Sequence, residues 1–150
     1  MQLFMTTQMK SENQKRDFIY DVMASFETLC SYNVACFIAC QFALESNFGQ
    51  SRIARTRHNL CGMKHPQLRP TYDLLRAATF ADYDSKESCF KDYQLWLAYS
   101  KFTQFDLSNV ECFKAKLRSK NYCPETDYID RIQSIFDWFN GFVSKKPFKN

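Results

Sequence analysis

The chain contains few of the residues that interrupt regular secondary structure. Its 150 residues include only three glycines and four prolines. A β-sandwich or β-barrel needs many tight turns, and glycine and proline are prominent among the residues that form them. The composition therefore argues against both of these fold classes.

Two longer sequence patterns are absent as well. No apolar run reaches the length of about 18 residues that indicates a membrane-spanning helix. The first 15 residues also lack the apolar segment of a secretory signal. We therefore expect no integral membrane segment and synthesis in a cytoplasm without a signal peptide. If the protein works outside that cytoplasm, another agent must release it.

The seven cysteines are odd in number and include no Cys-x-x-Cys pair. Several of them lie in helical apolar patterns, where cysteine behaves as a small hydrophobic residue. Only two histidines, His58 and His65, could complete a zinc site. We therefore expect free thiols, no bound metal and no other cofactor.

The size and charge of the chain limit its domain organisation and its partners. A chain of 150 residues with 45% apolar residues is expected to form one domain, residues 1–150, with an ordinary folded core. The net charge of +4 is mildly basic and suits an anionic partner. It falls short of the concentrated basic patch that binds nucleic acid, so we expect no nucleic-acid partner.

The first two helices are indicated by a capping pattern and by apolar spacing. The segment Ser11–Gln14 has the pattern of a capping box, and apolar residues at helical spacing follow it to about residue 30. The second helix, at about 33–45, is apolar nearly all round. A helix of that kind is buried on every side, so we expect it to form the centre of the fold.

Four further helices are expected, and an irregular section separates them. They are a short helix at about 51–56 and helices that open at Asp84, at Ser108 and near Pro124, the last of which ends near Gly141. Residues 58–83 show no clear period. The chain is therefore expected to be all-α, with helices around a buried central helix and one short irregular section.

One carboxylate stands where the central apolar helix meets a polar turn. The apolar run at 34–40 leads to Glu45, and polar residues and a glycine at 46–49 then break the run. Partial desolvation raises the pKa of a carboxyl group. A carboxylic acid that is still protonated near neutral pH can act as the general acid in glycosidic-bond cleavage. Spacing alone also fits a surface glutamate at a helix end.

Four blocks of sequence, taken in order, match the pattern of a known family. The blocks are QFALESNFGQSRIA at 41–54, HNLCGMK at 58–64, FADYDSKESCFKDYQLWL at 80–97 and NYCPETDYIDRIQSI at 121–135. They resemble the family 73 glycoside hydrolases, the N-acetylglucosaminidase domains of bacterial and phage wall-degrading enzymes. The resemblance implies a lysozyme-like helical fold in which residues 58–83 form a reduced β-lobe.

The same resemblance implies hydrolysis of the β-1,4 glycosidic bond in the glycan strands of peptidoglycan. Glu45 would be the general acid, and Tyr122 matches a family tyrosine proposed near the 2-acetamido group of the sugar. Five further residues are expected to bind substrate: Gln41, Asn59, Lys64, Tyr83 and Tyr128. Gln41 lies one helical turn before Glu45, where it can hydrogen-bond the carboxyl group or satisfy buried backbone.

The chain departs from the family pattern at the second catalytic group. Many members carry a second glutamate on a β-hairpin, whereas residues 63–80 contain no glutamate here. An inverting mechanism needs a second carboxylate roughly 6.5–9.5 Å from the first, for which Asp73 and Asp82 are candidates. We expect both to be solvated, and Asp84 to cap a helix. The alternative is substrate assistance, in which the acetamido oxygen attacks and Tyr122 orients it.

Three functions remain open at this point. The leading one is a phage endolysin or virion-associated lysin, made in the host cytoplasm, that acts on the wall after release by a holin or together with virion proteins. A lytic transglycosylase or muramidase on the same architecture can also use a single glutamate. The third is a non-catalytic virion structural or wall-binding protein, against which the retained Leu-Glu-Ser sequence at 44–46 argues.

Overall fold

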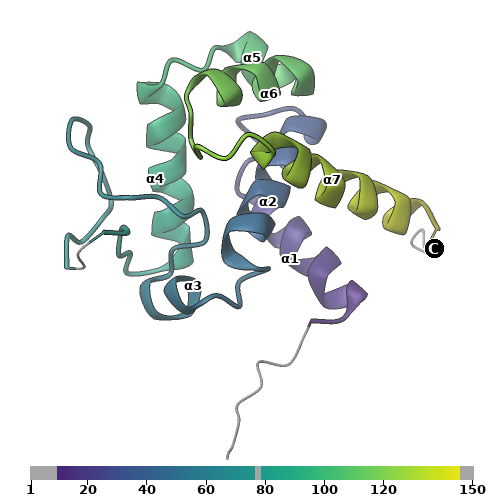
Figure 1. The fold of residues 1–150 in the computed structure, drawn as a ribbon, viewed down its shortest axis with the longest axis horizontal. Coiled ribbons are helices and arrows are strands. Elements are labelled where there is room, and N and C mark those ends of the chain that lie inside the picture. Colours follow the sequence, from purple (N-terminus) through teal and green to yellow (C-terminus); the bar gives the residue numbers. More distant parts are fainter. Residues whose placement is uncertain (1–9, 77–78, 146–150) are drawn as a thin grey trace, which may run out of the picture.

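The computed structural model describes residues 10–76 and 79–145, and within them it contains seven helices and no strand. The helices are α1 (Glu12–Ala24), α2 (Tyr32–Ser46), α3 (Arg52–Arg57), α4 (Lys86–Tyr99), α5 (Gln104–Ser108), α6 (Val110–Ser119) and α7 (Tyr128–Lys145). Figure 1 shows α2 between α4 on one side and α1 and α7 on the other. The prediction of an all-α fold is confirmed.

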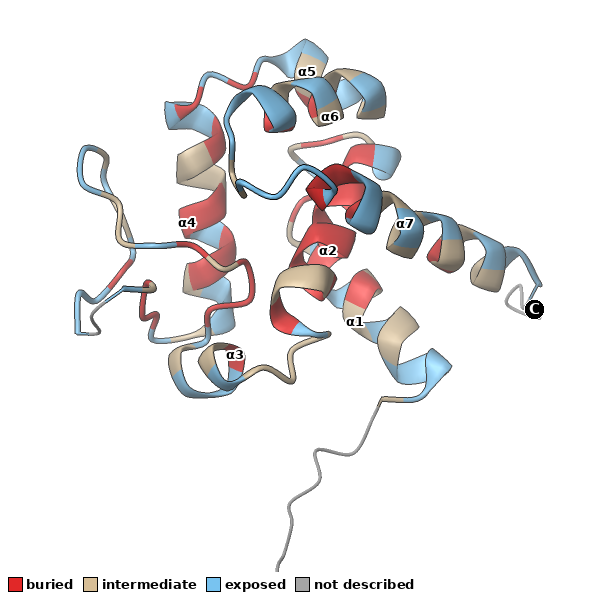
Figure 2. Ribbon diagram, in the orientation of Figure 1, coloured by how far each residue is buried: buried red, intermediate tan, exposed pale blue. Residues whose placement is uncertain are grey.

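The helix α2 is buried along almost its whole length, as Figure 2 shows. Every residue from Val34 to Ala43 is buried. The helix packs against α1 and α7, and the ring of Phe42 contacts that of Tyr93 on α4, with 5.0 Å between the ring centroids. The prediction that this helix forms the centre of the fold is confirmed.

Two predicted helix caps are wrong by one residue. Ser85 caps α4, because its hydroxyl accepts a hydrogen bond from the Ser88 amide, while Asp84 accepts one from the Ser88 hydroxyl. Asn109 caps α6, whereas Ser108 is the last residue of α5. In each case two adjacent residues can cap a helix, and the direction in which the chain enters the helix decides between them.

Three predicted helix ends also differ from the structure. α1 ends at Ala24, and the chain continues to residue 30 through hydrogen-bonded turns. α7 begins at Tyr128, and it continues through Gly141 to Lys145. A glycine inside a helix costs only about 1 kcal/mol relative to alanine, and Val143 beyond it still packs against the core.

No helix within the described residues is long and apolar enough to cross a membrane. All seven cysteines have free thiols, in agreement with the prediction, and five of them are buried. The prediction of a missing secretory signal rests largely on residues 1–9, which lie outside the described residues.

The irregular section at 58–83 folds back on itself without forming a strand in its described residues. One isolated antiparallel bridge joins Lys64 and Phe80. The Ala81 amide donates to the Met63 carbonyl at 2.9 Å, beside that bridge. The predicted irregular section is therefore present. The β-structure in its described residues is reduced to this single bridge.

Asp92 on α4 fixes this irregular section to the helices. Its buried carboxylate accepts two hydrogen bonds from the Arg69 guanidinium, at 2.9 and 3.1 Å. It also accepts hydrogen bonds from the Thr71 hydroxyl, the Tyr72 amide and the Tyr83 hydroxyl. Burial alone would raise the pKa of Asp92, but these hydrogen bonds outweigh burial and lower it. The carboxylate is therefore charged and paired inside the protein.

The substitution Asp92→Asn should strongly destabilise the fold, because it leaves the Arg69 guanidinium buried without a counter-charge. We expect a loss of about 3–5 kcal/mol in the free energy of unfolding, measured by urea unfolding at pH 7. Since the folded state lowers the pKa of Asp92, its contribution is fully present above about pH 4 and is lost as the pH falls through the folded pKa. The gap between variant and wild type should therefore shrink in acid.

The matched control is Asp21→Asn, which removes the same charge from an exposed ion pair with Lys86. Exposed ion pairs contribute little, so this variant should lose less than about 1 kcal/mol. Equal losses for the two variants would contradict the role assigned to Asp92.

Candidate active site

The turn after α2 presents Glu45 at the end of a buried helix. The Ser46 hydroxyl donates to the Phe42 carbonyl at 2.7 Å and accepts from the Gly49 amide at 2.9 Å. Asn47 and the residue after it take left-handed conformations, with φ of 50° and 55°. The helix therefore ends at Ser46, one residue after Glu45, whose side chain is half-buried.

The carboxyl group of Glu45 is held by Tyr128, the first residue of α7. The Tyr128 hydroxyl donates to Glu45 Oε2 at 2.6 Å. Desolvation by burial raises the pKa of Glu45, and the Tyr128 hydrogen bond and the charge of Arg131 only partly offset it. The carboxyl group therefore keeps its proton to a higher pH than a surface glutamate does.

A buried chain of hydrogen bonds leads to this carboxyl group. The Tyr93 hydroxyl donates to Gln41 Oε1 at 2.6 Å, and Gln41 Nε2 donates to the Tyr128 hydroxyl at 2.9 Å. Because Tyr128 accepts from Gln41, its own proton points to Glu45. Gln41 thus takes neither of the two expected roles, since it reaches Glu45 through Tyr128.

Gly62 lies against the other oxygen of the carboxyl group. Its φ is +71°, and a Cβ atom at this position would lie 2.7 Å from Glu45 Oε1. Both the backbone conformation and the available space therefore require glycine. Gly62 is not among the site residues predicted from the sequence, although its place in the second block and the scarcity of glycine are signals that point to it.

Asn59 shapes the loop that carries Gly62. Its side-chain amide donates to the Met63 carbonyl at 2.9 Å and to the Ala81 carbonyl at 3.0 Å. Its Oδ1 accepts from the Gly62 amide at 2.9 Å. Asn59 is fully buried, so these bonds hold the loop in place against Glu45.

Tyr122 is fixed beside the same loop. Its hydroxyl donates to the Cys61 carbonyl at 2.7 Å. Its ring stacks on that of Tyr128 at an interplanar angle of 9°, and it meets Trp96 edge-on with 4.9 Å between the ring centroids. The structure therefore places Tyr122 next to both groups that contact Glu45.

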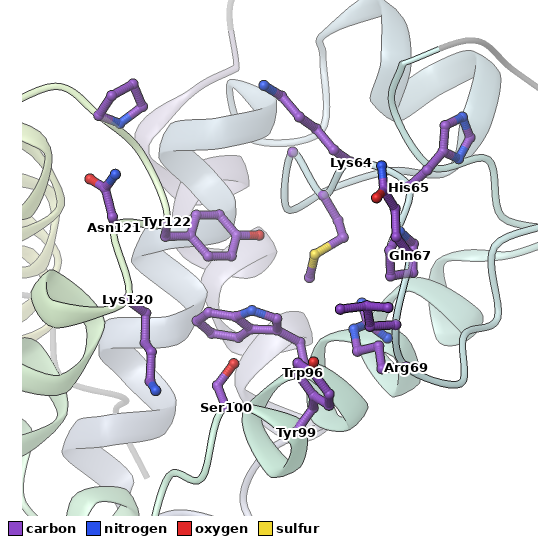
Figure 3. Close-up of a pocket in the computed structure, with 15 residues that line it drawn as sticks. Lys64, His65, Gln67, Arg69, Trp96, Tyr99, Ser100, Lys120, Asn121 and Tyr122 are labelled. Atoms are coloured by element: carbon purple, nitrogen blue, oxygen red, sulfur yellow. The ribbon is translucent and has the colours of Figure 1, made fainter.

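An open cleft of about 580 Å³ lies next to Gly62 (Figure 3). Its lining includes residues 62–69, Trp96 and Tyr122. A second hollow of about 360 Å³ is lined by Tyr122 and Tyr128. Glu45 is absent from both linings but contacts one residue of each, Gly62 and Tyr128. The carboxyl group therefore lies directly beside one lining residue of each hollow.

The residues expected to bind substrate fall into two groups. Lys64 lines the larger cleft, and Tyr128 lines the smaller hollow. Gln41, Asn59 and Tyr83 are fully buried. Their side chains bind Tyr128, the Gly62 loop and Asp92 respectively, so in this structure they position other groups and face no open surface.

The expectation that Asp73 and Asp82 are solvated is wrong, because both are buried. Asp73 contacts the His65 ring and accepts hydrogen bonds from backbone amides, which lower its pKa against the effect of burial. Asp82 pairs with Arg76 at 3.0 Å. Among the described residues that line the larger cleft, none is acidic.

Gly62→Ala should destabilise the protein, because the new Cβ atom would overlap Glu45 Oε1 in a backbone conformation that disfavours it. We expect a loss of about 2 kcal/mol or more in the free energy of unfolding, measured by urea unfolding. Gly141→Ala is the control, since it lies in α7 with no atom within 4 Å of the added Cβ. The control should raise the free energy of unfolding by roughly 0.5–1 kcal/mol. If Gly62→Ala lowers it by no more than about 0.5 kcal/mol, the close contact between Gly62 and Glu45 is contradicted.

Comparison with known proteins yields one family match and two similar structures. The family model "Glucosaminidase: Mannosyl-glycoprotein endo-beta-N-acetylglucosaminidase" matches residues 31–140. A chain of a type VI secretion system effector–immunity complex from Pseudomonas protegens superposes with a TM-score of 0.68 and 17% identity, covering 89% of this chain and 96% of that one. The catalytic domain of the autolysin Auto from Listeria monocytogenes gives a TM-score of 0.64 and 20% identity, covering 91% and 90%.

No curated protein matches the chain. At 17% and 20% identity the two solved structures show the fold alone. The family match includes all four sequence blocks and every residue that contacts the Glu45 carboxyl group. The predicted resemblance is therefore confirmed, and the chain belongs to the glucosaminidase family of glycoside hydrolases.

Proposed function

We propose that the protein hydrolyses a β-1,4 glycosidic bond in the glycan strands of peptidoglycan, with Glu45 as the general acid. The observation that supports this most directly is the setting of Glu45, a half-buried carboxyl group of raised pKa that contacts a lining residue of each hollow, Gly62 and Tyr128. Family membership favours an N-acetylglucosamine substrate. The similarity in fold to the catalytic domain of an autolysin favours the cell wall as its source.

The two oxygens of Glu45 have different roles in this proposal. Oε2 accepts the Tyr128 hydroxyl proton, so Oε1, beside Gly62, carries the acidic proton. Glu45 gives this proton to the oxygen that leaves the sugar as the glycosidic bond breaks. The hydrogen bond from Tyr128 and the charge of Arg131, which both lower the pKa of Glu45, stabilise the carboxylate that results.

For the second group we propose substrate assistance. The carbonyl oxygen of the 2-acetamido group attacks the anomeric carbon, and water then opens the ring that forms, losing a proton to the Glu45 carboxylate. Tyr122 donates its own proton to the Cys61 carbonyl, so its oxygen can accept the acetamide N–H and orient the group. No acidic side chain is among the described residues that line the larger cleft, which supports this route, whereas Glu125 lines the smaller hollow.

The origin of the protein, from a phage or from a bacterium, is a separate part of the proposal. The expected phage endolysin or virion-associated lysin, with release by a holin or together with virion proteins, stays a prediction from the sequence. The two similar structures are an autolysin domain and a chain of a type VI secretion system complex, both from bacteria. A bacterial wall hydrolase or secreted effector accords with these similarities, and neither favours a phage origin.

Glu45→Gln should abolish most of the activity, because it keeps the shape of the side chain and removes the acidic proton. We expect at least about a 100-fold loss in the rate of turbidity decrease of purified peptidoglycan. Mass analysis of the wild-type products should show N-acetylglucosamine at the reducing end. Muramic acid at that end would indicate a muramidase, and an anhydro sugar a transglycosylase.

The pH dependence provides a second measurement on the same variant. The protonated acid is active, so the wild-type rate should fall as pH rises through the folded pKa of Glu45, above the value of about 4.3 for an ordinary glutamate. Because that raised pKa makes the ionised side chain unfavourable in the fold, Glu45→Gln should be as stable as wild type or more stable at neutral pH. Near-normal wall clearance by the variant would refute the assignment.

Tyr122→Phe tests the second group, since it removes the hydroxyl and keeps the ring. We expect a loss of about tenfold or more in kcat, with samples matched for folded fraction. Tyr99→Phe is the control, because Tyr99 also lines the cleft and is exposed. The kcat of this variant should stay within about twofold of the wild-type value. The opposite result would be a kcat for Asp73→Asn or Asp82→Asn as low as that of Glu45→Gln, with Tyr122→Phe still active. The mechanism would then be inversion with that aspartate.

A further inference from the structure

The larger cleft carries uncompensated positive charge. Lys64 and Lys120 line it and are exposed, and within the described part of the chain neither has an ion-pair partner. Arg69 also lines the cleft, but the buried Asp92 neutralises its guanidinium. His65, another lining residue, contacts the Asp73 carboxylate. The net charge of the lining therefore comes from the two lysines.

The same cleft has a rigid aromatic surface. The Trp96 ring is in contact with three other rings, with centroid distances of 5.4 Å to Tyr93, 5.4 Å to Phe102 and 4.9 Å to Tyr122. Aromatic rings fixed in this way provide a flat apolar surface for the C–H faces of sugars. In Figure 3, Lys64 and Lys120 lie on opposite sides of the Tyr122 and Trp96 rings.

The two lysines beside the aromatic rings favour a charged glycan over a neutral one. A neutral β-1,4 strand would cover the aromatic rings and leave both lysines without an anion. A peptidoglycan strand carries peptides on alternate sugars, and the free carboxylates of those peptides extend to the side of the strand. Ammonium groups beside the aromatic surface match that arrangement, because charge complementarity favours the correct partner and its orientation.

We propose that this cleft binds a glycan segment that still carries its stem peptide, and that Lys64 and Lys120 bind the carboxylates of that peptide. The proposal rests on the proposed function and names its substrate class. The enzyme would thus prefer peptide-bearing strands over strands from which the peptides have been removed.

The experiment compares two forms of one substrate. The first is peptidoglycan purified free of phosphate-bearing polymers, so that peptide carboxylates are its main anions. The second is the same material after an amidase has removed the stem peptides. The measured quantity is kcat/KM for each form and their ratio, for wild type, Lys64→Gln, Lys120→Gln and the double variant.

Lys145→Gln is the matched control, since it removes the same charge from an exposed lysine outside the cleft lining. Lys145 ends α7, whose first residue is Tyr128, so the helical rise places it about 25 Å from Tyr128. Binding is measured separately by sedimentation with intact peptidoglycan, in the Glu45→Gln background, where cleavage does not interfere.

We expect wild type to prefer the peptide-bearing form by about tenfold or more. In the double variant this ratio should fall toward one, through a higher KM for the peptide-bearing form, while Lys145→Gln keeps the wild-type ratio. Salt at about 0.5 M should also reduce the preference, because exposed charges are screened. Equal cleavage of both forms by wild type, or an unchanged ratio in the double variant, would overturn this proposal alone. Failure of wild type to cleave either form would overturn the proposed function.

Discussion

The partly buried carboxyl group of Glu45 is the feature on which the other elements of the site depend. Burial raises its pKa, and burial is possible because α2 is surrounded by other helices along its length. Tyr128 at the start of α7 fixes one oxygen, and the Gly62 loop closes over the other. The ends of two helices and one loop must therefore meet within hydrogen-bonding distance for the acid to have its properties.

In its described residues, the irregular section at 58–83 is held by only a few backbone–backbone hydrogen bonds. Its backbone groups pair with buried side chains, as the hydrogen bonds of Asn59, Asp73 and Asp92 show. Buried backbone groups need partners wherever strands are missing. Three polar side chains therefore do here what a β-hairpin does by strand pairing, and one of them, Asn59, bonds the Gly62 amide and so holds Gly62 against Glu45.

Much of the fold could be predicted from local pattern, whereas the partners within the site could not. The all-round apolar character of α2 and the capping box at Ser11 are local properties, and both predictions are confirmed. The Gln41–Tyr128 hydrogen bond joins residues 87 positions apart, and no periodicity reveals it. The sequence predicts that Asp73 and Asp82 are solvated, because their hydrogen-bond and ion-pair partners come together only when the section folds.

The absence of an acidic side chain from the described lining of the larger cleft connects the proposed mechanism with the proposed substrate. A second carboxylate beside Glu45 would raise the pKa of that acid further through like-charge repulsion, and it would also repel an anionic peptide. In this structure burial is the largest cause of the raised pKa, and the charge of Glu125, which lines the smaller hollow, adds to it. If the acetamido group of the substrate attacks in place of a water activated by the protein, the cleft needs no second carboxylate. Its lysines then remain available to an anionic strand.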